Sequence, residues 1–157
     1  MYYEPLLKHE LRWRRAPWPL LLATLIFFAS GQSEIAGPPG IPFLDKMVHT
    51  GVFGLLATLV LRVNYRPGRV LRSVLTSVTL VSLYGIADEF RQSFTPGRSV
   101  EYADWIADTL GALVASLCYG YWTSWRRILE ADVSGREKNE EMSALAAAGG
   151  DTSVVSE

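Results

Sequence analysis

The sequence predicts an all-α integral membrane protein: a bundle of four transmembrane helices with the N- and C-termini in the cytoplasm. Three observations support this fold class. Four apolar runs, each near the ~20 residues that a bilayer requires, alternate with short charged segments. The basic residues gather in alternate segments, and a polar tail closes the chain. A length of 157 residues suits one domain.

The first apolar run follows a basic N-terminal region, residues 1–16, for which we predict a cytoplasmic location. Signal peptides and first membrane helices share this pattern. The small residues 29–31 match a cleavage site only loosely, so we predict an uncleaved helix from Pro17 to about Ile35. Pro17 and Pro19 suit its first turn, where a missing N–H has little cost.

The second helix is predicted from Met47 to Val63, after a loop at 36–44 that is rich in proline and glycine. Asp45 precedes this helix as a candidate N-cap. Small residues at spacings of three and four predict a face for close helix packing. They are Gly51, Gly54, Ala57 and Thr58.

The third helix is predicted from Val70 to Ala87, after a basic turn at 62–72, and a continuation through Gln92 is left open. The fourth is predicted from Trp105 to Trp122. Aromatic residues at its end indicate an interfacial belt. They are Tyr119, Tyr121, Trp122 and Trp125. The transmembrane domain thus spans 17–125, and 126–157 is predicted to be a disordered cytoplasmic tail, with a frayed helical start as an alternative.

The orientation follows from the lysines and arginines, which are enriched in cytoplasmic loops. Ten of them flank one side of the predicted bundle: Lys8, Arg12, Arg14, Arg15, Arg62, Arg66, Arg69, Arg72, Arg126 and Arg127. Three flank the other: Lys46, Arg91 and Arg98. The bias predicts a multi-pass protein of the bacterial cell membrane, with the lipid bilayer as its partner. The net charge of −1 and the four apolar runs exclude a nucleic-acid-binding module.

Three of the predicted helices carry polar residues near the outer membrane boundary. Asp45 and His49 are four residues apart, as are Asp104 and Asp108, so each pair shares a helix face. If the third helix continues to Gln92, then Gly85, Asp88, Glu89 and Gln92 also share a face. Asp108 lies one turn deeper than Asp104, where a lone charge is costly, so we expect a partner for it: Lys46, His49 or Arg98.

These residues predict a site at the outer face. Glu89, His49 and Asp104 are the candidates for acid–base catalysis. The candidates for substrate binding are Arg98, Lys46, Gln92, Asp45 and Asp108. A divalent cation held by Asp45, His49, Asp88, Glu89 and Asp104 is an alternative, but the spacing matches no metal motif, so we predict no metal and name no cofactor. A purely structural network, with Lys46 and Arg98 neutralising the acids, is a further alternative.

The motifs DKxxH (from Asp45), DExxQxFxPGR (from Asp88) and DWxADxxG (from Asp104) resemble those of the VanZ-like membrane proteins over residues 17–123. The resemblance implies a small multi-helix bacterial membrane domain. Its characteristic positions are held here by Asp45, Lys46, His49, Glu89, Gln92, Arg98, Asp104 and Gly111. The position of Asp108 is often Asn in the family. The namesake is associated with low-level resistance to the glycopeptide teicoplanin, and the resemblance does not specify a reaction.

The leading functional hypothesis is a VanZ-like protein whose outward polar face binds or modifies a cell-envelope component, such as a lipid-linked cell-wall precursor, with a link to glycopeptide resistance. The sequence does not distinguish binding from enzymatic modification. One alternative is a non-enzymatic membrane scaffold or assembly partner in which the polar residues join the helices. A second alternative, motivated by Asp108 within a helix, is a small transporter.

Overall fold

The computed structural model describes residues 14–31, 44–96, 101–130 and 142–143, and all regular secondary structure in these ranges is helical. The helices are α2 (Pro17–Ser30), α3 (Leu44–Asn64), the short 3₁₀ helix η1 (Pro67–Arg69), α4 (Val70–Gln92) and α5 (Tyr102–Tyr121). The predicted all-α class is therefore confirmed. The chain divides into two compact units, Met1–Tyr121 and Trp122–Glu157, and α2 to α5 belong to the first.

The helix boundaries differ from the predicted ones by a few residues at several ends, and α5, for example, begins at Tyr102 and not at Trp105. α2 ends at Ser30, five residues before the predicted Ile35, and Gly31 caps it. α3 begins at Leu44, so Asp45 lies in its first turn and is not the N-cap. α4 continues past Ala87 to Gln92 without a break. That extension is the condition on which the shared polar face of the third helix depended.

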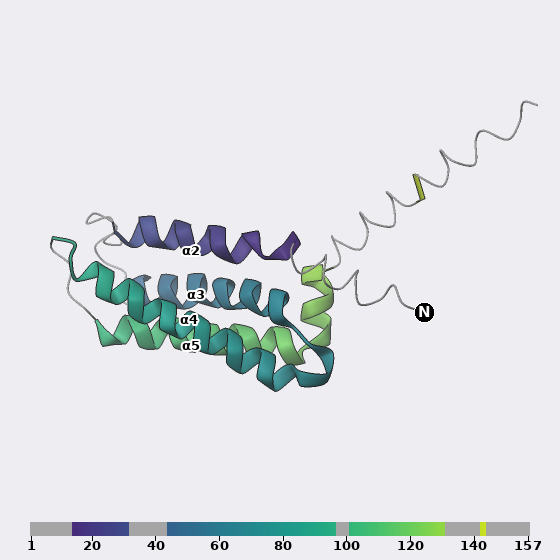
Figure 1. Cartoon of the computed structure of the whole chain (residues 1–157). Helices are drawn as coiled ribbons and strands as arrows, with labels where there is room; N and C mark the ends of the chain where they lie inside the picture. The colour runs from purple at the N-terminus through teal and green to yellow at the C-terminus, as the bar shows by residue number, and fades with distance from the viewer. Residues whose placement is uncertain (1–13, 32–43, 97–100, 131–141, 144–157) are drawn as a thin grey trace, which may run out of the picture. The chain divides into compact units, whose positions relative to one another are not determined.

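The four helices lie lengthwise beside one another in the first unit (Figure 1). α3 packs most closely against α5, α4 packs against both, and α2 contacts α3 and α4. The short turn through η1 reverses the chain between α3 and α4, because Pro67 cannot continue a helix and begins a 3₁₀ turn instead. The starts of α3 and α5 and the ends of α2 and α4 consequently lie at one end of the bundle.

Close approach of α3 and α5 depends on two glycines. A Cβ on Gly54 would lie 3.1 Å from the carbonyl oxygen of Gly111, and a Cβ on Gly111 would overlap the backbone of Thr50. The predicted small-residue face is thus confirmed at Gly54 and at Ala57, which is fully buried. It is wrong at Gly51, which is exposed and has no atom of the described residues within 4 Å of the position of a Cβ.

The core of the first unit contains buried side chains from α2, α3, α4 and α5. Phe53, Leu56 and Val81 are almost wholly buried there. Buried hydroxyls join the helices as well, since Ser77 donates to the carbonyl of Ala57 across 2.7 Å. Such bonds between helices replace the water that a bilayer interior lacks.

Within the described ranges, two helical segments are long and apolar enough to cross a membrane: Leu44–Asn64 and Pro67–Gln92. α2, with 14 residues, is apolar but shorter. Large apolar side chains also remain exposed along these helices, for example Leu25, Leu55 and Leu83 at 56%, 53% and 58%. Bilayer hydrocarbon is the environment in which such exposed faces cost nothing.

The predicted aromatic belt is corrected at Tyr119. This residue is fully buried, and its ring packs edge-on against Tyr65 with the centroids 5.8 Å apart. It therefore belongs to the contact between α5 and the residue that follows α3, whereas Tyr121 is exposed. In the second unit, residues 123–130 are helical, and they include the first five residues of the predicted tail. Residues 131–141 and 144–157 of that tail lie outside the described residues, as do most of the basic region 1–16 and the loop 36–43.

Candidate functional site

The predicted convergence of polar residues is found at the end of the bundle where α3 and α5 begin and α4 ends. We define the polar cluster as the residues that meet there: Asp45, Lys46, His49, Glu89, Glu101, Asp104 and Asp108. The side chains come from three helices and from Glu101, which immediately precedes α5. The cluster forms because the starts of two helices and the end of a third lie together.

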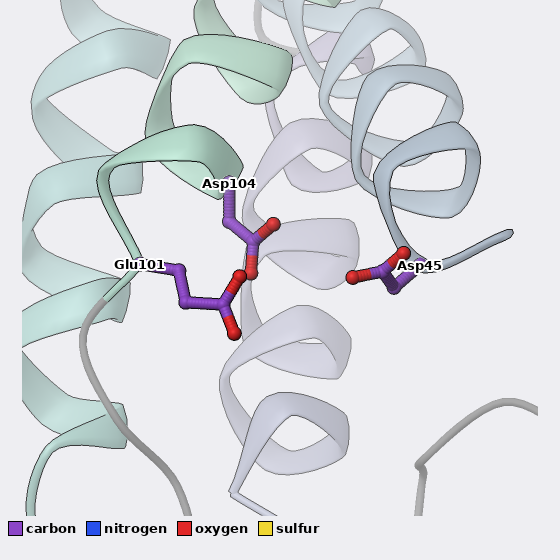
Figure 2. Close-up of side chains that lie close together, drawn as sticks. All are labelled: Asp45, Glu101 and Asp104. Atoms are coloured by element: carbon purple, nitrogen blue, oxygen red, sulfur yellow. The ribbon is translucent and has the colours of Figure 1, made fainter. Parts of the chain in front are cut away.

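Lys46 lies among three carboxylates. Its ammonium donates to Asp45 Oδ2 at 2.9 Å, to Glu101 Oε2 at 3.0 Å and to Asp104 Oδ1 at 2.5 Å. Figure 2 shows the carboxylates of Glu101 and Asp104 close together, with that of Asp45 opposite them. An ammonium has three N–H donors, so these carboxylates use its full donor capacity. Of the three, Asp104 has the least exposed side chain, at 10%.

The same three carboxylates form the one group in the described ranges with the spacing of a metal site, their ligand oxygens lying within 4.8 Å of one another. Oxygen ligands of this kind suit Ca²⁺ or Mg²⁺. The ammonium of Lys46, however, contacts all three and takes the place that a cation would fill. Of the five ligands considered for a cation from the sequence, only Asp45 and Asp104 belong to this group.

His49 and Asp108 form a second pair below Lys46. The imidazole Nδ1 lies 2.9 Å from Asp108 Oδ1. An ionised carboxylate only accepts hydrogen bonds, so Nδ1 is the donor, and in the neutral ring Nε2 carries the lone pair. The ring stacks on Phe53 with an interplanar angle of 14°, which holds its orientation. Nε2 lies 4.0 Å from Asp104 Oδ2, beyond hydrogen-bond distance.

Asp108 is 1% exposed, and its pairing with His49 confirms one of the three partners expected for it. Gly85 of α4 makes room for this carboxylate, since a Cβ there would lie 3.1 Å from Asp108 Oδ2. Removing an unpaired carboxylate from water to this depth is costly, and the imidazole offsets that cost with a hydrogen bond. The Asp108–His49 pair therefore connects α5 to α3 in the buried part of the cluster.

Glu89 has one occupied carboxylate oxygen and one without a partner. Oε2 accepts a hydrogen bond from the backbone N–H of Glu101 at 3.1 Å. Oε1 is buried and has no hydrogen-bond partner among the residues that the structure describes, and the residue as a whole is 4% exposed. The charged and titratable groups that act on it electrostatically include His49 and Asp104. A buried acceptor without a donor is uncommon in folded proteins and is a place where a ligand, a proton or a water fits.

Asp88 and Gln92, on the same face of α4, belong to a separate network. Asp88 accepts from Ser30 Oγ at 2.6 Å and from Gln92 Nε2 at 2.9 Å. Arg91 donates to Ser30 at 2.5 Å, and its guanidinium carbon lies 4.4 Å from the centroid of the Phe27 ring. These contacts attach the end of α2 to the end of α4. Asp88 and Gln92 therefore have structural partners distinct from Lys46 and His49.

The structure brings together most of the residues singled out from the sequence. Asp45, Lys46, His49, Glu89, Asp104 and Asp108 are in the polar cluster, while Gln92 lies in the neighbouring network. Arg98 lies outside the described residues, as does the turn at Gly97. Two participants were not among the catalytic or binding residues predicted from the sequence. Glu101 is three residues before Asp104, which was an available signal, whereas nothing in the sequence relates Ser30 to Asp88, 58 residues away.

The sequence profile of the VanZ/LLP1 family matches residues 10–123, which is most of the chain. The chain belongs to the VanZ/LLP1 family. No curated protein and no solved structure matches it. Family membership, together with the two long apolar helices, makes this a VanZ-like membrane protein. The matched region contains α2 to α5 and the whole polar cluster, so the cluster belongs to the part of the chain that defines the family.

The chemistry that the cluster offers is proton exchange and hydrogen-bond acceptance. When the His49 ring is neutral and Nδ1 donates to Asp108, Nε2 is an acceptor, an arrangement that makes a general base when a donor lies within reach. Glu89 Oε1 is a second acceptor. Lys46, by contrast, has its donors committed to three carboxylates. The described residues of the cluster therefore present acceptors to a ligand more than they present donors.

The role assigned to Asp108 predicts a defined tautomer for His49. In protein carrying ¹⁵N-labelled histidine, we expect the neutral His49 ring to have its proton on Nδ1, and Asp108→Asn to preserve this because an amide oxygen also accepts. Asp108→Ala should shift the ring towards the Nε2–H form. His9→Gln removes the signal of the other histidine. An Nε2–H tautomer in the unsubstituted protein would contradict the proposed pairing.

Proposed function

We propose that this VanZ-like protein uses the polar cluster to bind or modify a component of the bacterial cell envelope, on the outer side of the cell membrane. The proposed component is a lipid-linked cell-wall precursor. The phenotype to test is susceptibility to glycopeptides of the teicoplanin type. Both termini would then lie in the cytoplasm, as the distribution of lysine and arginine predicts.

The observation that carries this proposal is the buried Oε1 of Glu89, which has no hydrogen-bond partner among the described residues, in the same cluster as the imidazole that Asp108 orients. A network with a purely structural role is destabilised by a buried polar atom that has no partner, because such an atom costs about 1–3 kcal/mol. An unpaired acceptor next to a general base is instead typical of a site whose ligand completes the hydrogen bonds.

The position of the cluster supports an envelope component. It lies at the ends of membrane-length helices, where lipid headgroups and water meet the protein. Its outer members, Asp45 and Glu101, have half-exposed side chains at 53% and 51%, whereas Glu89 and Asp108 are buried. A ligand at headgroup level would therefore meet the exposed carboxylates of Asp45 and Glu101 first, and the buried carboxylates of Glu89 and Asp108 below them.

Glu89→Gln is the variant that tests this function, since the amide has nearly the same shape without the charge. We expect at least three quarters of the normal amount of folded protein in detergent, with loss of the glycopeptide or envelope-stress phenotype in cells. The measurement is size-exclusion chromatography of the purified protein beside susceptibility of a strain that depends on it. Unfolded protein would indicate a structural role instead, and a normal phenotype with normal folding would reject Glu89 as a functional group.

Glu130→Gln is the matched control for this experiment. It removes the same charge from the second compact unit, outside the matched family region. It should leave both folding and phenotype unchanged. A loss of phenotype in this control would show that the assay responds to net charge and not to the polar cluster.

A non-enzymatic scaffold is the second candidate function, and the satisfied environment of Lys46 favours it. One side chain there joins α3 to α5 and to Glu101 through three ion pairs. Under this alternative, charge-preserving changes such as Lys46→Arg would leave the phenotype intact, because only the joining of the helices matters.

A further inference from the structure

The described part of the polar cluster contains more carboxylates than cations. Five carboxylates, those of Asp45, Glu89, Glu101, Asp104 and Asp108, lie with one lysine ammonium and one imidazole. We propose that the cluster binds a primary ammonium group presented at the level of the lipid headgroups, with His49 Nε2, Asp104 Oδ2 and Glu89 Oε1 as its acceptors. This inference rests on the proposed function and names the chemical class of its ligand.

The alternative of a phosphate or carboxylate ligand has little support in the described residues. Lys46 is the cation of the cluster, and all three of its donors are directed at carboxylates 2.5–3.0 Å away. An anion that approached this ammonium would have to displace one of them and would meet the remaining carboxylates at close range. Like charges at such distances repel strongly where water is scarce.

The spacing of two acceptors matches a single ammonium nitrogen. His49 Nε2 and Asp104 Oδ2 are 4.0 Å apart, too far for a hydrogen bond to each other. A nitrogen about 2.9 Å from each would fit between them with near-normal hydrogen-bond lengths. An ammonium has a third N–H, and the buried Oε1 of Glu89 is an acceptor of the same cluster that has no donor among the described residues. One primary ammonium would satisfy the first two atoms when His49 is neutral, and its third N–H would be left for Glu89 Oε1.

The exposure of the side chains decreases from the surface of the polar cluster to its interior. The side chains of Asp45 and Glu101 are about half exposed, Lys46 is 26% exposed and His49 is 15% exposed. Glu89 and Asp108 lie beneath them. The exposed acids would attract a cation at the surface, and the deeper acceptors would distinguish an N–H-bearing group from a fully methylated one.

Three phospholipids with matched acyl chains test this inference. Phosphatidylethanolamine has a primary ammonium, phosphatidylcholine has the same charge without an N–H, and phosphatidylglycerol is anionic with hydroxyls. The full-length protein in detergent is titrated with each, and bound lipid is measured by native mass spectrometry. We expect phosphatidylethanolamine to bind about tenfold more tightly than phosphatidylcholine, the effect of one or two charge-assisted hydrogen bonds, and phosphatidylglycerol to bind most weakly.

Variants locate the effect in the cluster. Glu89→Gln should bring the ratio of phosphatidylethanolamine to phosphatidylcholine affinity towards one, and Glu130→Gln should leave it unchanged. If Glu89→Gln does not fold, the lipid series with the unsubstituted protein still decides the question. Displacement of bound phosphatidylethanolamine by soluble ethanolamine would support recognition of the ammonium alone, and resistance to displacement would support the intact lipid as the ligand.

Two outcomes separate this inference from the proposed function. Equal binding of phosphatidylethanolamine and phosphatidylcholine, or a preference for phosphatidylglycerol, would overturn ammonium recognition while leaving headgroup binding in place. Binding of none of the three lipids, together with a normal phenotype for Glu89→Gln, would remove the proposed function as well.

Discussion

Gly111→Ala should destabilise the protein by about 3 kcal/mol, the upper part of the usual range for overpacking. A Cβ at this position overlaps the carbonyl group of Thr50 and would lie 2.9 Å from the Thr50 Cα. The obstacle is backbone, so no rotamer change relieves it, and α3 must move away from α5. That movement would also separate Lys46 from Asp104 and His49 from Asp108. Thermal unfolding in detergent, followed by circular dichroism, measures the loss.

Gly51→Ala is the matched control for that substitution. Gly51 lies on the same helix as Thr50, is exposed, and has open space where a Cβ would be. Alanine there should be neutral or stabilising by up to about 1 kcal/mol, because glycine is the less favourable residue within a helix. Equal melting temperatures for the two variants would show that α3 and α5 do not approach as closely as the structure indicates.

Lys46→Met is expected to cost about 2 kcal/mol of stability. This is less than the 3–5 kcal/mol typical of a fully buried ion pair that loses one partner, because Asp45 and Glu101 are half exposed and water can solvate them. Most of the cost arises at Asp104. Its side chain is only 10% exposed, and its Oδ1 loses the ammonium that lies 2.5 Å away, so a poorly solvated carboxylate is left without its counter-charge. Denaturation in detergent at several salt concentrations is the measurement.

A double-mutant cycle tests whether the stability lost in Lys46→Met comes from the Lys46–Asp104 ion pair. Asp104→Asn removes the charge that Lys46 would leave behind, so Lys46→Met with Asp104→Asn should be less destabilised than the two single changes together imply, by about 1–2 kcal/mol. Additive effects would mean that Lys46 acts independently of Asp104. Strong coupling with a normal cellular phenotype in Lys46→Arg would favour the scaffold alternative, and a lost phenotype with normal stability would favour ligand binding.

The helices themselves follow from local sequence properties. Apolar length, Pro67 at the turn and the glycines of α3 are enough to place helices close to where they occur, with errors of a few residues at the ends. The largest error, at the end of α2, arises where Ser30 and Gly31 precede a polar stretch and apolar character alone does not define the stop. Tyr119 was misassigned because an aromatic residue near a helix end suits both a membrane interface and a helix contact.

The sequence was enough to predict which residues form the polar cluster, but not which of them pair with each other. Spacings of three and four residues place His49 with Asp45, and Asp104 with Asp108, on helix faces. Lys46 and His49 pair with particular carboxylates because of the position of α3 along its axis relative to α5. The close contacts of Gly111 with Thr50 and of Gly54 with Gly111 determine this axial position.

The sequence by itself determined the helical class, the family, the number of apolar runs and the residues that can carry charge at one membrane boundary, because these depend on composition and on spacing within single helices. Only the tertiary structure decided that Lys46 is held by three carboxylates, that Asp108 orients His49, and that Glu89 keeps an unpaired oxygen. The physical reason is that hydrogen bonds between helices depend on atomic distances of about 3 Å. Those distances follow from how closely the helices pack, which no periodicity within one helix encodes.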